Sequence, residues 1–213
     1  MNGKPESADT ASDGANALNL LLNRHSVGPR HLVEPGPDAD QILHATAAAM
    51  RAPDNQALRP FRFVLIPRKY REALGELFAA CARRSGISAE DVATERERAL
   101  RGPVLLAFVA CIDAAHERVP PHEQWLAAGG ALSNFMTALH FMGFGAKVLS
   151  GRKAADAEIS RAFCAEGEIL VGWIAAGTPS KTPHPRESDF PDSVFRVWEP
   201  DGVRKAGLAP NTQ

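Results

Sequence analysis

The amino-acid sequence predicts an α+β protein with one central sheet between helices. Four apolar runs have the length of strands and about six segments have helical spacing, but the two kinds do not alternate as in a doubly wound parallel sheet. The longest helical segment has no Asp, Glu, Lys or Arg between Glu123 and Lys147. It is apolar on nearly every face, so we expect it to be buried on nearly every face.

The first part of the chain is predicted to hold a tail and two helices. Residues 1–14 are polar and lack apolar periodicity, which indicates a disordered N-terminal tail. Leucines at helical spacing predict a helix over 15–24, and the proline-rich stretch 27–37 is expected to be a loop. Asp38 begins a second helix as the first residue of a capping box, and Pro53 prevents this helix from continuing.

The middle of the chain is predicted to form two strands separated by two helices. The strand over 61–66 places aromatic side chains on one face. Amphipathic spacing predicts a helix over 68–84, and a second capping box predicts another over 88–100. The continuous apolar run 104–111 is typical of a central strand.

The long uncharged helix is followed by the remaining predicted elements. A glycine-rich turn at 143–145 ends this helix. We then expect a strand over 146–150, a short helix over 154–163 and a last strand over 169–176. Residues 181–213 are rich in Pro, Asp, Arg and Lys, which predicts an extension that wraps the surface or is partly disordered.

Composition favours a single domain, residues 15–180, with tails. The 213 residues are 45% hydrophobic and 23% charged, and their net charge of −1 provides no field of one sign for nucleic acid or anionic lipid. A membrane span over the uncharged run is the first alternative, since that run is long enough. Its polar residues, its paired glycines and the chain's mean hydropathy of −0.19 favour a core helix instead.

The cysteines indicate neither a disulfide framework nor a metal site. Cys81, Cys111 and Cys164 are odd in number, lie far apart and form no CxxC pair. The N-terminus also lacks the basic region and apolar core of a signal peptide. We therefore expect a cytoplasmic protein with three buried thiols.

Two short motifs carry the side chains with the most chemistry. Arg24-His25-Ser26 follows a helix, and a guanidinium beside a hydroxyl suits a phosphate, although basic residues at a helix end also interact with its dipole. Arg51 and Asn55 lie on a turn, where their donors and acceptor suit the edge of a heteroaromatic ring. Simple turn chemistry is the alternative for this second motif.

Other catalytic patterns are absent from the sequence. No GxGxxG follows a strand and no GxxxxGK[ST] occurs, so neither a Rossmann nor a P-loop site is supported. No nucleophile and base stand at an informative spacing, and His140 is expected to be a satisfied core histidine. A cofactor enzyme needs no such nucleophile.

Taken in order, three blocks resemble the nitroreductase family of flavoenzymes. They are Leu21-Leu22-Asn23-Arg24-His25-Ser26, then Met50-Arg51-Ala52-Pro53-Asp54-Asn55 followed by Pro60-Phe61-Arg62-Phe63, and last the core helix with its Gly-Phe-Gly turn, strand and Ser150-Gly151. The resemblance covers residues 17–179. It implies a mainly antiparallel sheet flanked by helices, in a homodimer with FMN at its interface.

The resemblance also implies an activity. The expected function is an FMN-dependent oxidoreductase that passes a hydride from NAD(P)H through flavin N5 to a small acceptor such as a nitroaromatic or quinone. A flavin-binding or interaction protein without turnover, or a relative that breaks down reduced flavin, remains an alternative. No metal, nucleic acid or membrane is expected as a partner.

Individual residues receive roles from the same resemblance. Arg24, His25 and Ser26 would hold the FMN phosphate and ribityl chain. Arg51 and Asn55 would reach the flavin from the partner subunit, with Arg51 as the candidate for stabilising reduced flavin. The other side of the flavin would be lined by Val148, Leu149 and Ser150. A nicotinamide would contact the last turn of the core helix, which comprises Ala138, Leu139, His140, Phe141, Met142 and Gly143.

The chain departs from the family pattern near this site. Val148-Leu149-Ser150-Gly151 stands where one branch of the family has Trp-Arg-Ser-Gly, so Leu149 occupies the place of a phosphate-facing Arg. Lys147 shares a strand face with Leu149 and is expected to replace part of that charge. Gly28 stands where the family often has a basic residue, and Arg59-Pro60-Phe61 replaces a frequent Gln-Pro-Trp.

Overall fold

The computed structural model describes residues 10–181, 193–200 and 202–205, which belong to two compact units. The helices of the first unit are α1 (Thr10–Leu22), α2 (Ala39–Ala49), α3 (Arg71–Arg84), α4 (Ala89–Glu97), α5 (Pro121–Phe141) and α6 (Ala157–Phe163). Its strands are β1 (Leu32–Val33), β2 (Phe61–Leu65), β3 (Val104–Ala110), β4 (Gly145–Leu149) and β5 (Ile169–Pro179).

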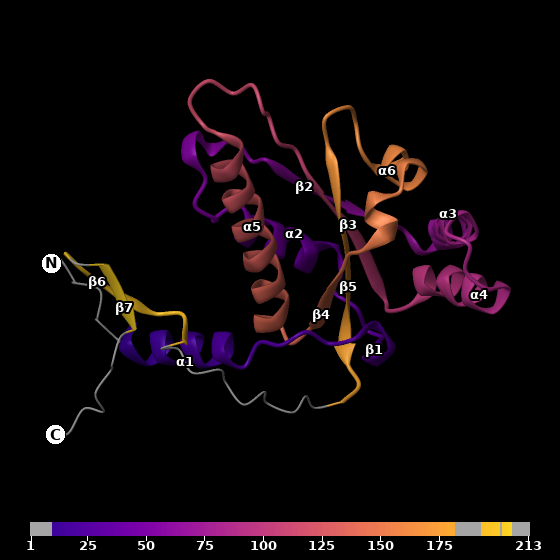
Figure 1. Cartoon of the computed structure of the whole chain (residues 1–213). Helices are drawn as coiled ribbons and strands as arrows, with labels where there is room; N and C mark the ends of the chain where they lie inside the picture. The colour runs from indigo at the N-terminus through magenta and orange to yellow at the C-terminus, as the bar shows by residue number, and fades with distance from the viewer. Residues whose placement is uncertain (1–9, 182–192, 201, 206–213) are drawn as a thin grey trace, which may run out of the picture. The chain divides into compact units, whose positions relative to one another are not determined.

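The five strands of the first unit form one antiparallel sheet (Figure 1). Their order is β1-β5-β3-β2, and β4 also pairs with β5. The long strand β5 is the centre of the sheet: it pairs with β3 from Val104↔Ala176 to Ala110↔Ile169 and with β4 up to Leu149↔Trp173. Helices lie on both sides of the sheet, which confirms the predicted α+β class.

Both faces of the sheet are covered, and β3 shows why its sequence is continuously apolar. Leu105 packs in the core under α3 and α6, whereas Leu106 and Phe108 pack in a second core under α2 and α5. Because successive side chains of a strand point to opposite faces, a strand between two helical layers needs apolar residues at every position. Figure 1 shows α5 and α2 on one side of the sheet and α3, α4 and α6 on the other.

Helix α5 is the core helix that the uncharged run predicts, but it is not buried on every face. Phe135 and Leu139 are fully buried, and the Phe135 ring stacks on Phe63 with centroids 4.3 Å apart. Trp125 and Leu126 instead remain 40% and 73% exposed. The prediction of near-complete burial is therefore wrong for the single chain, because only one side of α5 meets the sheet and α2. Among the described residues, no helix combines the length and hydropathy needed to cross a membrane.

Helix α3 is fastened to the sheet by a buried arginine. Arg71 is 1% exposed, and its guanidinium donates to the carbonyl oxygens of Gly102 and Pro103 at 2.7 and 2.9 Å. Burial lowers the pKa of Arg71 from its ordinary value. Two of its nitrogens are thus paired, whereas its buried Nε has no partner among the described residues. Arg71 connects α3 to the loop that leads into β3.

Several boundaries differ from the sequence predictions. Helix α1 begins at Thr10, so residues 10–14 are helical rather than part of a tail, and residues 1–9 lie outside the described residues. The predicted loop 27–37 contains the two-residue strand β1, which gains its partner from β5, distant in sequence. Local propensity could not show this pairing.

The second unit contains a hairpin. Strands β6 (Arg196–Glu199) and β7 (Gly202–Lys205) pair antiparallel. They fall within the predicted extension 181–213, whose remaining residues after Lys181 lie largely outside the described part of the chain.

Candidate active site

The Arg24-His25-Ser26 motif lies against the beginning of β4. The amide of Val27 donates to the carbonyl oxygen of Ala146 at 3.1 Å, which ties the loop to the strand. This approach requires Gly145, because a Cβ at that position would lie 2.8 Å from a methyl carbon of Val27. Gly145 therefore does more than follow the turn after the core helix, because its missing side chain lets the Arg24-His25-Ser26 motif pack against β4.

A cavity of about 260 Å³ joins this motif to β4 and α5. Arg24 and Ser26 line it together with Val148. The wall from α5 consists of Gly129, Leu132, Ser133 and Met136. Gly129 faces open space, since a Cβ there would meet nothing within 4 Å. The exposed face of α5 that carries Gly129 and Ser133 thus borders the same cavity as the guanidinium of Arg24 and the hydroxyl of Ser26.

His25 does not line this cavity. Its Nδ1–H donates to the carbonyl oxygen of Asn23 at 2.9 Å, and its ring meets the edge of the His140 ring with centroids 6.2 Å apart. His140 in turn donates from Nε2 to the carbonyl oxygen of Leu20 at 3.0 Å, and burial lowers its pKa. His140 therefore joins the last turn of α5 to α1, as expected for a satisfied histidine.

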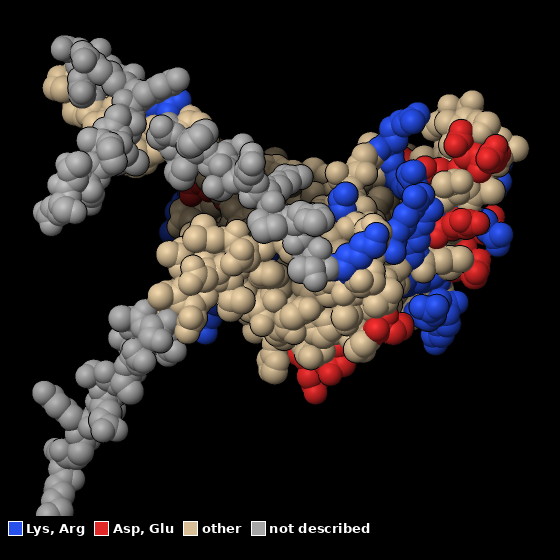
Figure 2. All heavy atoms as spheres, turned by 90° about the horizontal axis from the view of Figure 1, so that it is seen from below, with Lys and Arg blue, Asp and Glu red and all other residues tan. Residues whose placement is uncertain are grey.

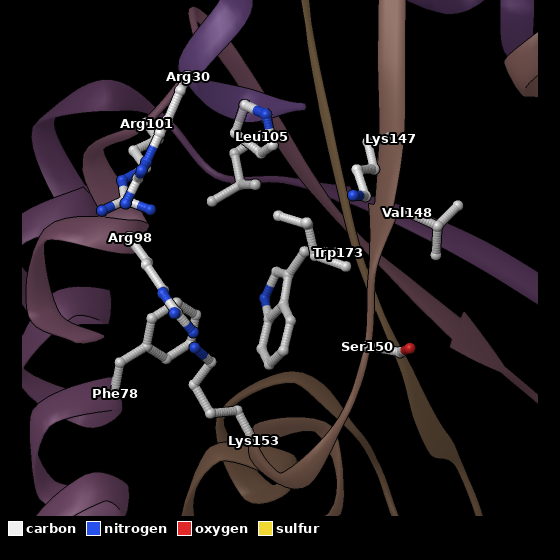
Figure 3. Close-up of a pocket in the computed structure, with 12 residues that line it drawn as sticks. Arg30, Phe78, Arg98, Arg101, Leu105, Lys147, Val148, Ser150, Lys153 and Trp173 are labelled. Atoms are coloured by element: carbon white, nitrogen blue, oxygen red, sulfur yellow. The ribbon is translucent and has the colours of Figure 1, made fainter. Parts of the chain in front are cut away.

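A second, larger cavity of about 460 Å³ lies on the side of the sheet that α3 and α4 cover. Five cationic side chains from four parts of the chain line it (Figure 3): Arg30, Arg98, Arg101, Lys147 and Lys153. Its apolar lining consists of Pro29, Phe78, Leu105, Val148, Leu149 and Trp173, and Ser150 completes the wall. We call this space the basic cavity. Figure 2 shows a band of Lys and Arg side chains on the side where α3 and α4 lie.

Only part of the positive charge in the basic cavity is compensated. Glu95 pairs with Lys153 and, at 2.5 Å, with Arg98. Within residues 10–181, no acceptor lies within bonding distance of the side chains of Arg30, Arg101 or Lys147. A partly enclosed space with unpaired cations and aromatic walls suits an anionic, planar ligand.

Both cavities border β4, on opposite faces of the strand, because Val148 packs in the core under α2 and α5 and Leu149 in the core under α3 and α6. Val148 lines both of them, while Lys147, Leu149 and Ser150 line the basic cavity. The backbone of β5 at Gly172 lies very close to the end of β4. A Cβ on Gly172 would lie 2.4 Å from the carbonyl oxygen of Leu149, so only glycine fits at this position. The predicted residues Val148, Leu149 and Ser150 thus belong to one lined region, but Leu149 does not share a cavity with Arg24 and Ser26.

The second predicted motif lies in neither cavity. Asn55 donates from Nδ2 to Glu123 at 3.0 Å, which ties the turn after α2 to the start of α5. Arg51 is exposed, and within the described part of the chain its side chain has no acceptor. Gln56 follows with a φ of 61°, in the left-handed region that non-glycine residues rarely adopt. This turn is therefore held in a defined shape while its arginine remains available.

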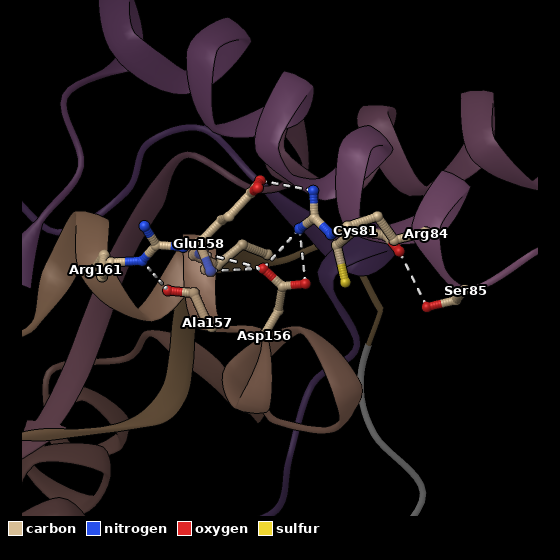
Figure 4. Close-up of polar contacts among 8 residues, drawn as sticks. Cys81, Arg84, Ser85, Asp156, Ala157, Glu158 and Arg161 are labelled. Atoms are coloured by element: carbon tan, nitrogen blue, oxygen red, sulfur yellow. Dashed lines mark hydrogen bonds and ion pairs between the residues drawn. The ribbon is translucent and has the colours of Figure 1, made fainter.

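Polar clusters elsewhere hold elements together. Arg84 on α3 binds both Asp156, the N-cap of α6, and Glu158 (Figure 4). Arg62 on β2 binds Glu168, and this ion pair lowers the pKa of the carboxyl to about 2.

The thiols are poor candidates for catalysis. All three cysteines are free, and burial raises the pKa of Cys111 to about 11 and also raises that of Cys81. No group of three or more His, Cys, Asp or Glu side chains suited to a metal ion occurs among the described residues.

Sequence comparisons find relatives along most of the chain. Residues 21–178 match the family model described as "Nitroreductase family". The Escherichia coli protein named "Putative NAD(P)H nitroreductase YdjA" is 32% identical over 164 residues, which cover 76% of this chain and 88% of that protein. A Haemophilus influenzae protein named "Putative NAD(P)H nitroreductase" is 31% identical over 163 residues, with the same coverage.

Solved structures share the fold. A nitroreductase-like family protein from Bacillus cereus superimposes with a TM-score of 0.73 at 17% identity, covering 93% of this chain and 99% of that one. A mutant of NfnB from sphigopyxis sp., described as an FMN and NADPH-dependent nitroreductase, has a TM-score of 0.64 at 19% identity, with 86% and 99% covered.

Proposed function

The chain belongs to the nitroreductase family, and from this premise we propose that it is an FMN-dependent oxidoreductase that uses NADH or NADPH to reduce a small acceptor such as a nitroaromatic or a quinone. The observation that carries the proposal is the pair of cavities that border β4. One is lined by a guanidinium and a hydroxyl, and the other by unpaired cations and aromatic rings.

The residues present fit FMN. Arg24 and Ser26 offer the donors that a terminal phosphate needs. The basic cavity offers apolar and aromatic walls for a planar ring, and its volume of about 460 Å³ is in the range of small-molecule sites. Among the described strands β4 pairs only with β5, so a ligand with an anionic tail and a planar head could reach both spaces around the other edge of β4.

When bound, FMN supplies the redox chemistry by taking electrons from a nicotinamide and giving them to an acceptor. The chain's residues would bind, orient and shield it. Arg98, Arg101 and Lys147 would stabilise the negative charge that the ring gains on reduction, since cations placed beside a developing charge stabilise it. Phe78 and Leu105 would exclude water from one side.

We further propose a homodimer whose partner completes the site. The cavity beside α5 opens along Gly129 and Ser133, and Leu126 on the same helix is 73% exposed. Arg51 is exposed and lines neither of the two cavities described above, so it is available to a second subunit, with Asn55 beside it. The free thiols fit a cytoplasmic location.

A titration with FMN tests the proposal. Purified protein supplied with FMN is expected to be yellow and to bleach when NADH or NADPH is added under nitrogen. Arg24→Ala should weaken FMN binding, whereas the control Arg83→Ala, which removes an exposed arginine paired with Glu76 on α3, should not. A wild-type protein that fails to bind FMN would overturn the proposal. Yellow protein that neither nucleotide bleaches would favour a flavin-binding protein without turnover.

A further inference from the structure

Trp173 is a buried tryptophan whose hydrogen-bond donor has no partner. The residue lies on the central strand β5 and is only 2% exposed. Its Nε1 atom is buried, and no acceptor in the described part of the chain lies within hydrogen-bonding distance. A buried N–H that loses its water partners and gains no protein partner destabilises the folded state, and such groups are rare in folded proteins.

The indole ring is held in its orientation from two sides. Its ring meets Phe78 edge to face with centroids 4.9 Å apart, and Phe163 likewise at 6.3 Å. Its backbone pairs with Ala107 of β3 and with Leu149 of β4. The ring therefore has little freedom to turn its N–H toward an acceptor of the protein.

The unpartnered donor faces the basic cavity. Trp173 is one of the residues that line this space, and Figure 3 shows its indole nitrogen on the side of the ring that faces the interior. Arg30, Arg101 and Lys147 line the same space without acceptors of their own among the described residues. The charged groups of the wall are thus all donors, and the carboxylate of Glu95, which pairs with Arg98 and Lys153, is not part of the lining. A ligand that fits must bring acceptors.

We propose that Trp173 Nε1–H is a ligand-binding donor, which pairs with an acceptor atom of the heteroaromatic ring that occupies the basic cavity. This inference rests on the proposed function for the identity of that ring, FMN. The cations would stabilise the negative charge that the ring gains on reduction, whereas the indole N–H, fixed by its aromatic neighbours, would select a ring that presents an oxygen or nitrogen acceptor at that point.

Trp173→Phe is the decisive variant, because it removes the N–H and keeps an aromatic ring. The variant also removes buried ring volume, so some loss of melting temperature is expected whatever the role of the N–H, and affinity is therefore the readout. FMN binding should weaken about tenfold, the loss expected for one hydrogen bond of about 1.4 kcal/mol. A purely structural tryptophan would instead show a lowered melting temperature with FMN affinity unchanged in the folded variant. Trp198→Phe, the same substitution at a 73% exposed site, is the control.

A measurement on the wild-type protein gives an independent test. The chain has three tryptophans, so protein labelled with ¹⁵N-tryptophan has three indole N–H signals, and Trp125→Phe and Trp198→Phe assign the remaining one to Trp173. Addition of FMN should move that signal downfield and slow its exchange with solvent. Wild-type binding of FMN with an unmoved Trp173 signal, or with equal affinity in Trp173→Phe, would overturn the inference and leave the proposed function intact. Absence of FMN binding in the wild type would refute the proposed function itself.

Discussion

Leu149→Arg should tighten FMN binding, and this prediction tests how β4 faces the ligand. Leu149 and Lys147 both line the basic cavity, because residues two apart on a strand share a face. An arginine at this position would add a bidentate donor beside the unpaired ammonium of Lys147. A recovered charge-assisted hydrogen bond contributes about 1.5–3 kcal/mol, which corresponds to about tenfold to hundredfold in affinity.

The same substitution should cost stability in the ligand-free protein. Two residues along a strand span about 7 Å, so two like charges there repel by about 0.6 kcal/mol in water and about 2.4 kcal/mol at an effective dielectric constant near 20. The basic cavity is open to solvent on one side, so we expect about 1 kcal/mol, added to the loss of Leu149 packing against its core. A loss of about 1 kcal/mol in the free energy of unfolding lowers the melting temperature by roughly 2–4 °C in a chain of this length, and the lost packing adds to this decrease.

A double-mutant cycle with Lys147→Ala provides the assay. FMN is titrated into the wild type, both single variants and the double variant, and the melting temperature of each is measured without ligand. Lys147→Ala should weaken FMN binding in the wild type. The same substitution should reduce affinity less in the Leu149→Arg background, because the introduced arginine compensates for the lost ammonium group. Unchanged affinity in Leu149→Arg would show that this face of β4 does not meet the ligand, and the placement of the ring in the basic cavity would be refuted.

Three further predictions concern stability and assembly. Arg71→Met should lower the free energy of unfolding by about 2–4 kcal/mol, because two backbone carbonyls lose their buried donor; denaturant unfolding that matches the wild type would contradict this. Glu168→Gln should cost about 1–2 kcal/mol at neutral pH, discounted for the 38% exposure of Arg62. Since the folded-state pKa of Glu168 is lowered to about 2, the wild-type advantage is complete above about pH 5 and disappears as the pH falls toward 2, which chemical denaturation across that range measures. Mixing Arg24→Ala with Arg51→Ala chains should restore about a quarter of the FMN sites if each site uses Arg24 of one subunit and Arg51 of the other, and no recovery in mixed dimers would remove the shared assignment.

Most of the local structure was predictable because its signals are local. The capping box at Asp38 is present with both of its hydrogen bonds, and Ser88 caps α4 as expected. The apolar run 104–111 became the fully covered strand β3. The order of the Arg24 and Arg51 motifs was enough to indicate the nitroreductase family, which the comparisons confirm.

The contacts that build the candidate site depend on residues far apart in the chain. No spacing indicates that Arg30, Arg98 and Lys153 line one cavity, since each comes from a segment far from the others in the sequence. Trp173 looks like any core aromatic in the sequence, and only the rings of Phe78 and Phe163 fix where its N–H points.

What the sequence determined by itself was the set of elements, their caps and the family, because periodicity and short motifs are properties of neighbouring residues. The tertiary structure decided which side chains meet. It separated Leu149 from Arg24, placed an arginine at position 71 inside the core, and left one face of α5 exposed. The physical reason is that burial and hydrogen-bond pairing arise from packing between layers. The sequence pattern of one helix or strand does not specify which side chains a neighbouring element places against it.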